Sequence, residues 1–400
     1  MKVLIINAGS SSLKYQLLNM DNEAVMASGI VERIGSESGD LTHKTMVDNK
    51  TEKTEIKQEI PDHKVAMHLV VDLITDPEKG VVKDKNDIGA IGHRVVQGGE
   101  AFSSAILVDD SVKQAIKENF PLAPLHNPAN LTGIEVAEEL FSGIPNVAVF
   151  DTEFHQTMPA KAFLYALPYE YYTDLKVRRY GFHGTSHKYV ATKAAAILGK
   201  KPEEVNVITV HLGNGCSMAA VKKGKCLDTS MGMTPLAGVM MGTRTGDIDP
   251  AIISYLVEHN NMTPQELDDV FNKKSGLAGI CGMNDMRDIH SAADNGDEMA
   301  KLAVDMFAYR VKKYIGAYTA VLGTVDIVAF TAGIGENDDI VRAAVCEDMT
   351  GLGINVDLKK NEGRFGEPQA IHKDGSPVEV WVIPTNEELQ IAQDTVNILK

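Results

Sequence analysis

Residues 3–12 read VLIINAGSSS, and residues 208–217, about half a chain further on, read ITVHLGNGCS. Each stretch begins with an apolar run typical of a buried strand and passes through a Ser-rich or Gly-rich turn. A second strand-like segment follows in each case, Leu13–Leu18 or Met218–Val221. This weak internal repeat predicts two similar halves that each begin with a hairpin. An apolar strand before a glycine turn also arises by chance, so the repeat alone is a soft signal.

The rest of the chain alternates short apolar runs with helical patterns, which predicts an α/β fold with mixed sheets. The expected strands are Val3–Asn7, Ile88–Ile91, Val147–Phe150, Val205–His211, Ile327–Phe330 and Val378–Ile383. The expected helices are one opened by Asp249 as N-cap and Pro250, one opened by a Thr263–Glu266 capping box, one from Thr185 or Ser186 to Leu198, and a core helix Glu298–Leu322.

The length of the chain, 400 residues, favours two domains, because single cores seldom grow past ~250–300 residues. No low-complexity linker marks the boundary. We place an N-terminal domain at 1–150 plus 385–400 and a C-terminal domain at 151–384.

The charge balance excludes several classes of partner. Lys+Arg is 39 against Asp+Glu 55, a formal net charge of −16, which disfavours nucleic acid and anionic membranes. No apolar run approaches the ~20 residues that span a bilayer, and the N-terminal apolar stretch is shorter than a signal-peptide core. Four cysteines are too sparse for a disulfide scaffold. We therefore expect a cytoplasmic protein with reduced thiols.

The first turn, Asn7–Lys14, reads NAGSSSLK. Gly9 permits a tight turn, the hydroxyls and backbone N–H groups can surround an anion, and Lys14 adds a point charge. The stretch lacks the P-loop pattern, and a Ser-rich hairpin turn is the alternative. We favour the anion site because so many suitable groups lie within eight residues.

Two further glycine turns end predicted strands. His211–Gly215 can bring backbone amides against phosphate oxygens, although Asn-Gly is also a common hairpin turn. Thr331–Asn337 contains Gly333 and Gly335 at a strand end. A dinucleotide-binding motif is disfavoured there, because Asp338 occupies the place of its third glycine.

Basic side chains lie beside these glycines and strand ends. Arginine binds carboxylate and phosphate with two parallel hydrogen bonds, so the cluster suits a small anionic substrate. Any single arginine is more often a surface ion pair. The candidates are His93, Arg94, Arg178, Arg179, His183, Arg244 and Arg287.

Acidic candidates are Asp151, after an apolar strand, and the pair Glu387 and Glu388. Asp at a strand end is a frequent Mg²⁺ or catalytic position, though often only a helix cap. Thr385 and Glu388 match a capping box, which leaves Glu387 as the candidate for a metal-linked site.

Together these segments resemble the acetate/propionate/butyrate kinase family, within the actin, sugar-kinase and heat-shock chaperone ATPase superfamily. They span the chain in the family's order. The matching stretches are VLIINAGSSSLK (3–14), GHRVVQGGE (92–100), FDTEFHQTMP (150–159), RRYGFHGTSH (178–187), HLGNG (211–215), DTSMGMTPLAGVMMGTRTGDIDP (228–250), FTAGIGEN (330–337) and PTNEE (384–388).

The resemblance implies two duplicated domains of the actin-like, ribonuclease H-like fold, with the active site in the cleft between them. It implies a homodimer that uses ATP and Mg²⁺, or Mn²⁺ as an alternative metal, and forms acetyl phosphate and ADP reversibly from acetate. The N-terminal domain would be the carboxylate and Mg-phosphate side, and the C-terminal domain the nucleotide side.

The resemblance also implies a role for each matching residue. Asp151, His183 and Arg244 would be catalytic, Asn7 and Glu387 would be linked to the metal, and Arg94 would contact the carboxylate. A pocket for the acetate methyl group would be formed by Val96, Leu125, Phe182 and Pro235. The nucleotide would be held by Lys14, His211, Leu212, Gly213, Asn214, Gly215, Asp285, Met286, Arg287, Gly333, Ile334, Gly335, Glu336 and Asn337.

The chemistry of such a reaction limits the role of Asp151. A carboxylic acid is already ionised at pH 7, so the enzyme has no substrate proton to remove. We therefore expect Asp151 to orient Arg94 or Arg244, or to hold a metal-bound water. Two alternatives stay open: a propionate or butyrate kinase of the same family, and a non-metabolic actin-like ATPase. One methylene changes discrimination by only ~1–3 kcal/mol, so the sequence does not separate the acids.

Overall fold

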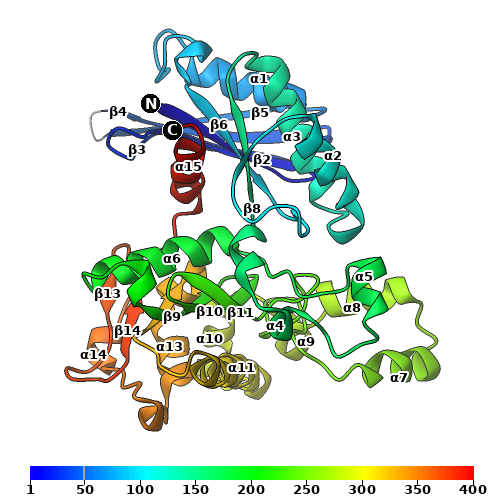
Figure 1. The fold of residues 1–400 in the computed structure, drawn as a ribbon, viewed down its shortest axis with the longest axis vertical. Helices are drawn as coiled ribbons and strands as arrows, with labels where there is room; N and C mark the ends of the chain where they lie inside the picture. Colours follow the sequence, from blue (N-terminus) through cyan, green and yellow to red (C-terminus); the bar gives the residue numbers. More distant parts are fainter. Residues whose placement is uncertain (48–49) are drawn as a thin grey trace. The chain divides into compact units, whose positions relative to one another are not determined.

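A computed structural model describes residues 1–47 and 50–400 of the chain (Figure 1). It divides into two compact units: unit 1 comprises 1–156 and 386–400, and unit 2 comprises 157–385. The expected boundaries differ from these by up to six residues. Asp151 therefore belongs to unit 1, whereas the expected boundary places it in the C-terminal domain.

Unit 1 is built on an eight-stranded sheet with strand order β5-β4-β3-β2-β1-β6-β8-β7. Its strands are β1 (Lys2–Ala8), β2 (Ser12–Asn19), β3 (Ala24–Glu32), β4 (Gly39–Val47), β5 (Lys50–Gln58), β6 (Ala90–Val95), β7 (Ile106–Leu107) and β8 (Asn146–Phe150). Its helices are α1 (His63–Ile74), α2 (Asp110–Glu118), α3 (Asn127–Leu140) and α15 (Glu387–Ile398).

Helices cover both faces of this sheet around β1. Leu4 and Ile6 belong to a buried apolar cluster that includes residues of α1 and α3. On the other face α15 lies against β1 and β6. A Cβ at Gly92 would lie 2.9 Å from both Ile5 and Ile391, so only glycine lets this helix approach so closely. Alternate residues of β1 thus face opposite helical layers.

Unit 2 is built on a six-stranded sheet with strand order β11-β10-β9-β12-β14-β13. Its strands are β9 (Asn206–Leu212), β10 (Cys216–Lys222), β11 (Lys225–Thr229), β12 (Ile327–Thr331), β13 (Gln369–Ala370) and β14 (Glu379–Val382). Its helices are α4 (Ala160–Phe163), α5 (Glu170–Leu175), α6 (Gly184–Ile197), α7 (Ala251–Asn260), α8 (Pro264–Lys273), α9 (Gly276–Cys281), α10 (Met286–Asp294), α11 (Glu298–Leu322), α12 (Ala332–Asn337), α13 (Asp339–Cys346) and α14 (Leu358–Asn361). Figure 1 shows α6 and α11 on opposite faces of the sheet.

The two sheets share one five-strand topology, which confirms the predicted duplication. The order β3-β2-β1-β6-β8 in unit 1 corresponds to β11-β10-β9-β12-β14 in unit 2. In unit 1, β3, β2 and β1 pair in antiparallel fashion, and β6 and β8 continue the sheet parallel to β1. In unit 2, β11, β10 and β9 pair in antiparallel fashion, and β12 and β14 continue the sheet parallel to β9. Helices α15 and α6 also correspond: α15 packs on β1 and β6, and α6 packs on the equivalent strands β9 and β12.

Two expected elements are displaced. The strand expected at Ile88–Ile91 is β6, and it lies further along the chain because Ile88 closes a short turn on Lys85. The expected strand ended too early because Gly92 and Arg94 have no strong preference for β-strands. Helix α6 begins at Gly184, with His183 as its N-cap residue in the left-handed region at φ 57°. The sequence indicated Thr185 or Ser186, whose hydroxyls lie inside the helix instead.

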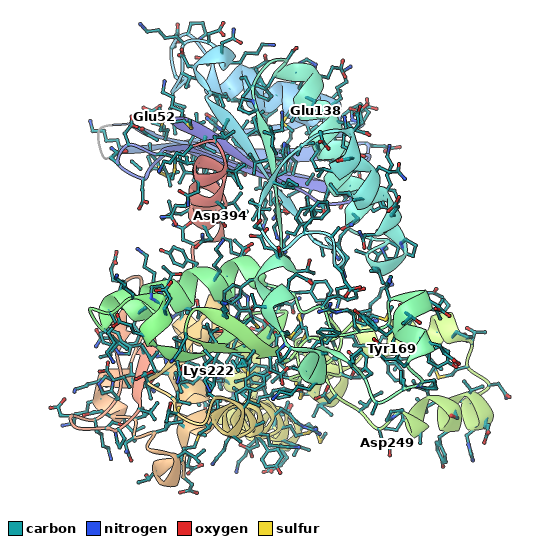
Figure 2. The ribbon with its side chains drawn as sticks, viewed as in Figure 1. Glu52, Glu138, Tyr169, Lys222, Asp249 and Asp394 are labelled. Atoms are coloured by element: carbon teal, nitrogen blue, oxygen red, sulfur yellow. The ribbon has the colours of Figure 1, made fainter. Side chains whose placement is uncertain are left out.

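Helix caps were partly predicted. The Thr263 capping box and the bounds of α11 are confirmed. Helix α7 begins one residue later than expected, and Asp249 accepts a hydrogen bond from the Ala251 N–H (Figure 2). The capping box of Thr385 with Glu388 is wrong, because Asn386 is the N-cap of α15 and accepts from the Leu389 N–H at 3.0 Å.

Strands β3 to β5, β7, β11 and β13 were not predicted from the sequence. Strand β5 reads KTEKTEIKQ and is exposed along most of its length, so it carries no apolar run. Among the described residues, no helix is long and apolar enough to cross a membrane.

Candidate functional site

The first group of candidate residues gathers at the carboxyl ends of the parallel strands of unit 1. Asn7 lies near the end of β1, Arg94 near the end of β6, and Asp151 directly after β8. Glu387 is the first residue of α15, which crosses the same strands. The carboxyl ends of parallel strands are where open α/β sheets bind ligands.

Arg94 and Asp151 form a two-point ion pair. The Arg94 Nε donates to Asp151 Oδ1 at 3.0 Å, and its NH2 donates to Oδ2 at 2.5 Å. The remaining terminal nitrogen, NH1, donates to the Asn7 Oδ1 at 3.3 Å. Asp151 is 2% exposed. The carboxylate therefore fixes the plane of the guanidinium, as expected for a group that orients Arg94.

Glu387 lies partly buried beside this pair. Burial raises the pKa of its carboxyl group to about 7, against the opposing effect of Arg94, and the nearby Asp151 charge raises it further. Burial alone would lower the pKa of Arg94, but Asp151 and Glu387 raise it, so the guanidinium stays charged. Arg94 is thus a permanent cation surrounded by oxygen acceptors.

Other expected residues of unit 1 have varied surroundings. Lys14 is exposed on β2 and pairs in register with Asn7. Val96 is buried, and its N–H donates to Asn130 Oδ1 at 3.0 Å. Leu125 is 71% exposed in the loop before α3. His93 is buried against Asn146, and burial lowers its pKa to about 4.

Sequence reasoning missed the asparagines that hold the end of β6. The Asn130 side chain accepts from the Val96 N–H and donates to the Ala8 carbonyl at 2.7 Å. The Asn127 amide both accepts from the Gln97 N–H and donates to the Gln97 carbonyl. The motif Asn127-Pro-Ala-Asn at the start of α3 was a visible signal, because asparagine with proline marks a helix start.

Unit 2 contains a cavity of about 540 Å³, within the size range of small-molecule sites. Four separate segments of the sequence converge on it: the turn after β9, the start of α10, the helix α12 with the residue after it, and the loop after α14. It is lined by Gly213, Asn214, Asn284, Asp285, Met286, Arg287, Gly333, Ile334, Asn337, Asp338 and Arg364.

Thirteen of the residues expected around a nucleotide belong to unit 2, and eight of these line the cavity. The five that do not line it are His211, Leu212, Gly215, Gly335 and Glu336. Leu212 is fully buried at the end of β9. The Glu336 carboxylate turns away to accept from the backbone N–H groups of Ala332 at 2.8 Å and Thr385 at 3.1 Å. It stabilises Ala332 at φ 64° and so acts on the backbone. Asn284, Asp338 and Arg364 were not assigned to the site from sequence.

Beside the same turn, a histidine and an arginine face one space. A methyl group added at Gly215 would lie 3.6 Å from His183 Nε2 and 3.7 Å from Arg244 NH1. The His183 ring stacks on His211 with centroids 4.2 Å apart. Arg244 NH1 donates to the Pro235 carbonyl at 3.3 Å, and burial lowers the pKa of its guanidinium. Phe182, next to His183, is buried.

The other basic candidates of unit 2 have structural partners. Arg179 NH1 donates to three successive carbonyls, those of Thr229, Ser230 and Met231. The Arg178 guanidinium stacks over the Phe163 ring at 3.7 Å. Neither arginine belongs with the cavity, which separates them from Arg287 at its wall.

One wall of the cavity is held by an ion pair. His290 Nε2 lies 2.8 Å from the Asp338 carboxylate, which also caps α13 by accepting from the Val341 N–H. The hydrogen bond with Asp338 raises the pKa of His290 above its ordinary value of 6.5. The protonated histidine therefore ties α10 to the start of α13.

Comparison with known proteins gives consistent results. The model of the acetokinase family matches residues 2–393. The chain is 63% identical over its whole length to a full-length protein of Oleidesulfovibrio alaskensis named acetate kinase. A crystal structure of Porphyromonas gingivalis acetate kinase matches with a TM-score of 0.95 at 47% identity, covering 100% of both chains. A propionate kinase from Francisella tularensis matches with a TM-score of 0.91 at 41% identity, covering 99% of both.

We predict that His290→Gln destabilises unit 2 more at pH 6 than at pH 9. A raised pKa in the folded state contributes stability below pH 6.5, and this stability is lost as pH rises through the raised value. The loss at pH 6 should be about 1 kcal/mol. The chain's single tryptophan, Trp381, lies in β14, so its fluorescence during urea unfolding reports on unit 2. Equal destabilisation at both pH values would contradict the prediction.

Proposed function

The chain belongs to the acetokinase family and is a carboxylate kinase, and on this premise we propose that it phosphorylates acetate with the γ-phosphoryl group of ATP. The reaction is reversible and yields acetyl phosphate and ADP. The observation that carries the proposal is the space beside Gly215, which His183 Nε2 and Arg244 NH1 both face. The same turn contributes Gly213 and Asn214 to the cavity.

The nucleotide is the ligand of the cavity in unit 2. Its volume suits a nucleoside phosphate, and the glycines Gly213 and Gly333 leave their backbone open to a ligand. Lys14 of unit 1 supplies a charge for the phosphates, and His211 supports His183 by ring stacking. The terminal phosphoryl group lies at the space beside Gly215.

The carboxylate substrate binds at Arg94. Its nucleophilic oxygen is an anion that must approach a second anion, so catalysis depends on positioning and charge neutralisation. Arg94 and Arg244 supply the positive charge, and His183 donates a hydrogen bond to the oxygens of the transferring group. The apolar side chains expected near the methyl group are those of Val96, Leu125, Phe182 and Pro235. Transfer is direct and in line.

Asp151 positions Arg94. Its carboxylate uses both oxygens on the guanidinium, and this reaction has no substrate proton for it to take. A guanidinium held at two points presents its NH1 in one direction, toward the position of Asn7.

Asn7 and Glu387 would hold Mg²⁺. Both offer oxygen, the ligand that Mg²⁺ and Mn²⁺ prefer, and a cation would stabilise the ionised form of a carboxyl group whose pKa burial has raised. Nucleotide oxygens and water would complete the coordination of the ion, since Mg²⁺ usually keeps several waters and binds substrate phosphates. When bound, the ion offsets phosphate charge.

The acid preference is tested by trapping the acyl phosphate with hydroxylamine. We expect acetate to give the highest kcat/KM among acetate, propionate and butyrate, and we expect the product to require ATP and a divalent metal. A preference for propionate would indicate a propionate kinase, the activity named for the similar structure from Francisella tularensis. ADP release without stimulation by any of the acids would instead indicate an ATPase.

We predict that Asp151→Asn lowers kcat by about 100-fold, because a misplaced Arg94 spoils the alignment of the substrate. The acidic limb of the pH–rate profile should stay where it is in the wild type. Asp228→Asn, which removes a carboxylate near the structural Arg179, is the control for general loss of stability. A lost acidic limb in Asp151→Asn would indicate proton transfer by this residue.

The protein is proposed to be a cytoplasmic homodimer. Its four cysteines in 400 residues are too few for the disulfide scaffold of a secreted protein, and its proposed substrates are metabolites of the cytoplasm. Helix α7 reads AIISYLVEHN and has no buried residue, and a hollow of about 390 Å³ joins its Ile253 to Leu167. Tyr169, beside α5, is also exposed (Figure 2). An apolar surface of this kind is suited to a second copy of the chain.

We expect light scattering to give twice the 43.4 kDa mass of the chain. Tyr255, 61% exposed on α7, would place a charge in the contact when changed to glutamate, so Tyr255→Glu should give the single-chain mass. A monomeric wild type would overturn the homodimer, and a dimeric Tyr255→Glu would move the contact elsewhere.

A further inference from the structure

A row of side-chain hydrogen bonds lies behind His183 in unit 2. The His183 Nδ1 is 2.8 Å from Ser217 Oγ, and the same oxygen is 2.7 Å from His187 Nε2. The other ring nitrogen of His187, Nδ1, is 2.7 Å from Thr209 Oγ1. Ser217, His187 and Thr209 are all fully buried. The row connects β9, β10 and α6, and none of its members behind His183 was singled out from sequence.

The number of protons restricts this row to two arrangements when both rings are neutral. Ser217 has one hydroxyl proton, and its oxygen has no hydrogen-bond partner among the described residues other than the two imidazoles. A buried hydroxyl proton needs an acceptor, so Ser217 donates to one imidazole and accepts from the other. In the first arrangement Ser217 donates to His183, His187 donates to Ser217, and Thr209 donates to His187. In the second arrangement every one of these bonds is reversed.

The geometry at Thr209 favours the first arrangement. There the Thr209 hydroxyl proton is used in the 2.7 Å bond to His187. In the second arrangement this proton has to turn to the Ala219 carbonyl, which lies 3.4 Å away. A hydroxyl bond of 2.7 Å is close to optimal and one of 3.4 Å is weak. The first arrangement therefore keeps every bond of the row short.

The choice decides what His183 offers to a ligand. In the first arrangement Nδ1 accepts, so the proton of the neutral ring is on Nε2, the atom that faces the space beside Gly215 with Arg244. In the second arrangement Nε2 is bare and presents a lone pair to an anion. Only the first lets a neutral imidazole donate to a phosphoryl oxygen.

We propose that Ser217, His187 and Thr209 are positioning residues that keep His183 in its Nε2–H form. His183 then donates to the transferring phosphoryl group without having to be protonated, although the cationic Arg244 lies nearby and His211 stacks on its ring. This inference rests on the proposed function, since it assigns the anion to the transferred phosphoryl group.

The tautomer is read directly by long-range ¹H–¹⁵N correlation spectra of protein labelled at histidine, recorded at pH 8 without substrates. His183→Gln identifies the signal among the 12 histidines. We expect the pattern of a ring protonated at Nε2 in the wild type. A ring protonated at Nδ1 would overturn the proposal. The spectrum is recorded without turnover, so a wrong tautomer can be distinguished from a lack of acetate kinase activity in the hydroxylamine assay.

The second measurement compares kcat across pH in Ser217→Ala. Without the hydroxyl both tautomers become accessible, so kcat should fall about tenfold at pH 8. At pH 6 a larger share of the ring is protonated on both nitrogens, and the ratio to wild type should rise. Ser217→Thr, which keeps the hydroxyl, should restore the wild-type profile.

The control is Ser230→Ala, which removes a buried serine hydroxyl that accepts from the Met218 N–H in the same unit and does not touch His183. It should cost stability and leave a kcat ratio that does not change with pH. The same flat ratio in Ser217→Ala would assign Ser217 a structural role only and overturn the proposal.

Discussion

A guanidinium removed from water keeps its charge only where acceptors surround it, and three arginines of this chain meet that constraint in different ways. Arg94 is held at two points by a buried carboxylate. Arg342 is fully buried and donates to neutral oxygens, among them the Gly335 carbonyl at 3.0 Å in α12. Arg244 bonds to the neutral Pro235 carbonyl. The Asp151 carboxylate therefore orients Arg94 but offsets part of its positive potential. Arg244 has a neutral partner, so its positive potential remains available to an anion.

The duplicated topology explains why such residues come from distant parts of the sequence. In each unit parallel strands end at one edge of the sheet, and the turns that follow them carry the functional groups. In unit 1 this edge gathers Asn7, Arg94 and Asp151. In unit 2 it gathers the turn after β9 and the helix α12 after β12. Neighbouring strands in a sheet need not be neighbours in sequence, so side chains nearly 90 positions apart, such as Asn7 and Arg94, contact each other.

Most of the candidate site could be predicted from sequence because glycine turns after apolar strands are local features. Two such turns, His211–Gly215 and Gly333–Asn337, were expected to hold one nucleotide, and residues of both line one cavity. Predictions from side-chain type were wrong where a partner distant in sequence takes the hydrogen bond that a local partner was expected to form. Ser186 looked like a helix cap, but its hydroxyl bonds to His211. Glu336 looked like a ligand, but its carboxylate stabilises the backbone of Ala332. The polar residues that support the site, Asn130 and Ser217, had no strong local signal.

By itself the sequence determined the α/β class, the duplication, and the segments that carry chemistry, because hydrophobic periodicity and glycine turns act over a few residues. Only the tertiary structure decided which partner each polar group found. Asp151 pairs with Arg94, and Asn386 rather than Thr385 is the N-cap of α15. Ser217 lies between His183 and His187. Hydrogen bonds and ion pairs depend on distances of a few ångströms, and packing across the sheets sets those distances.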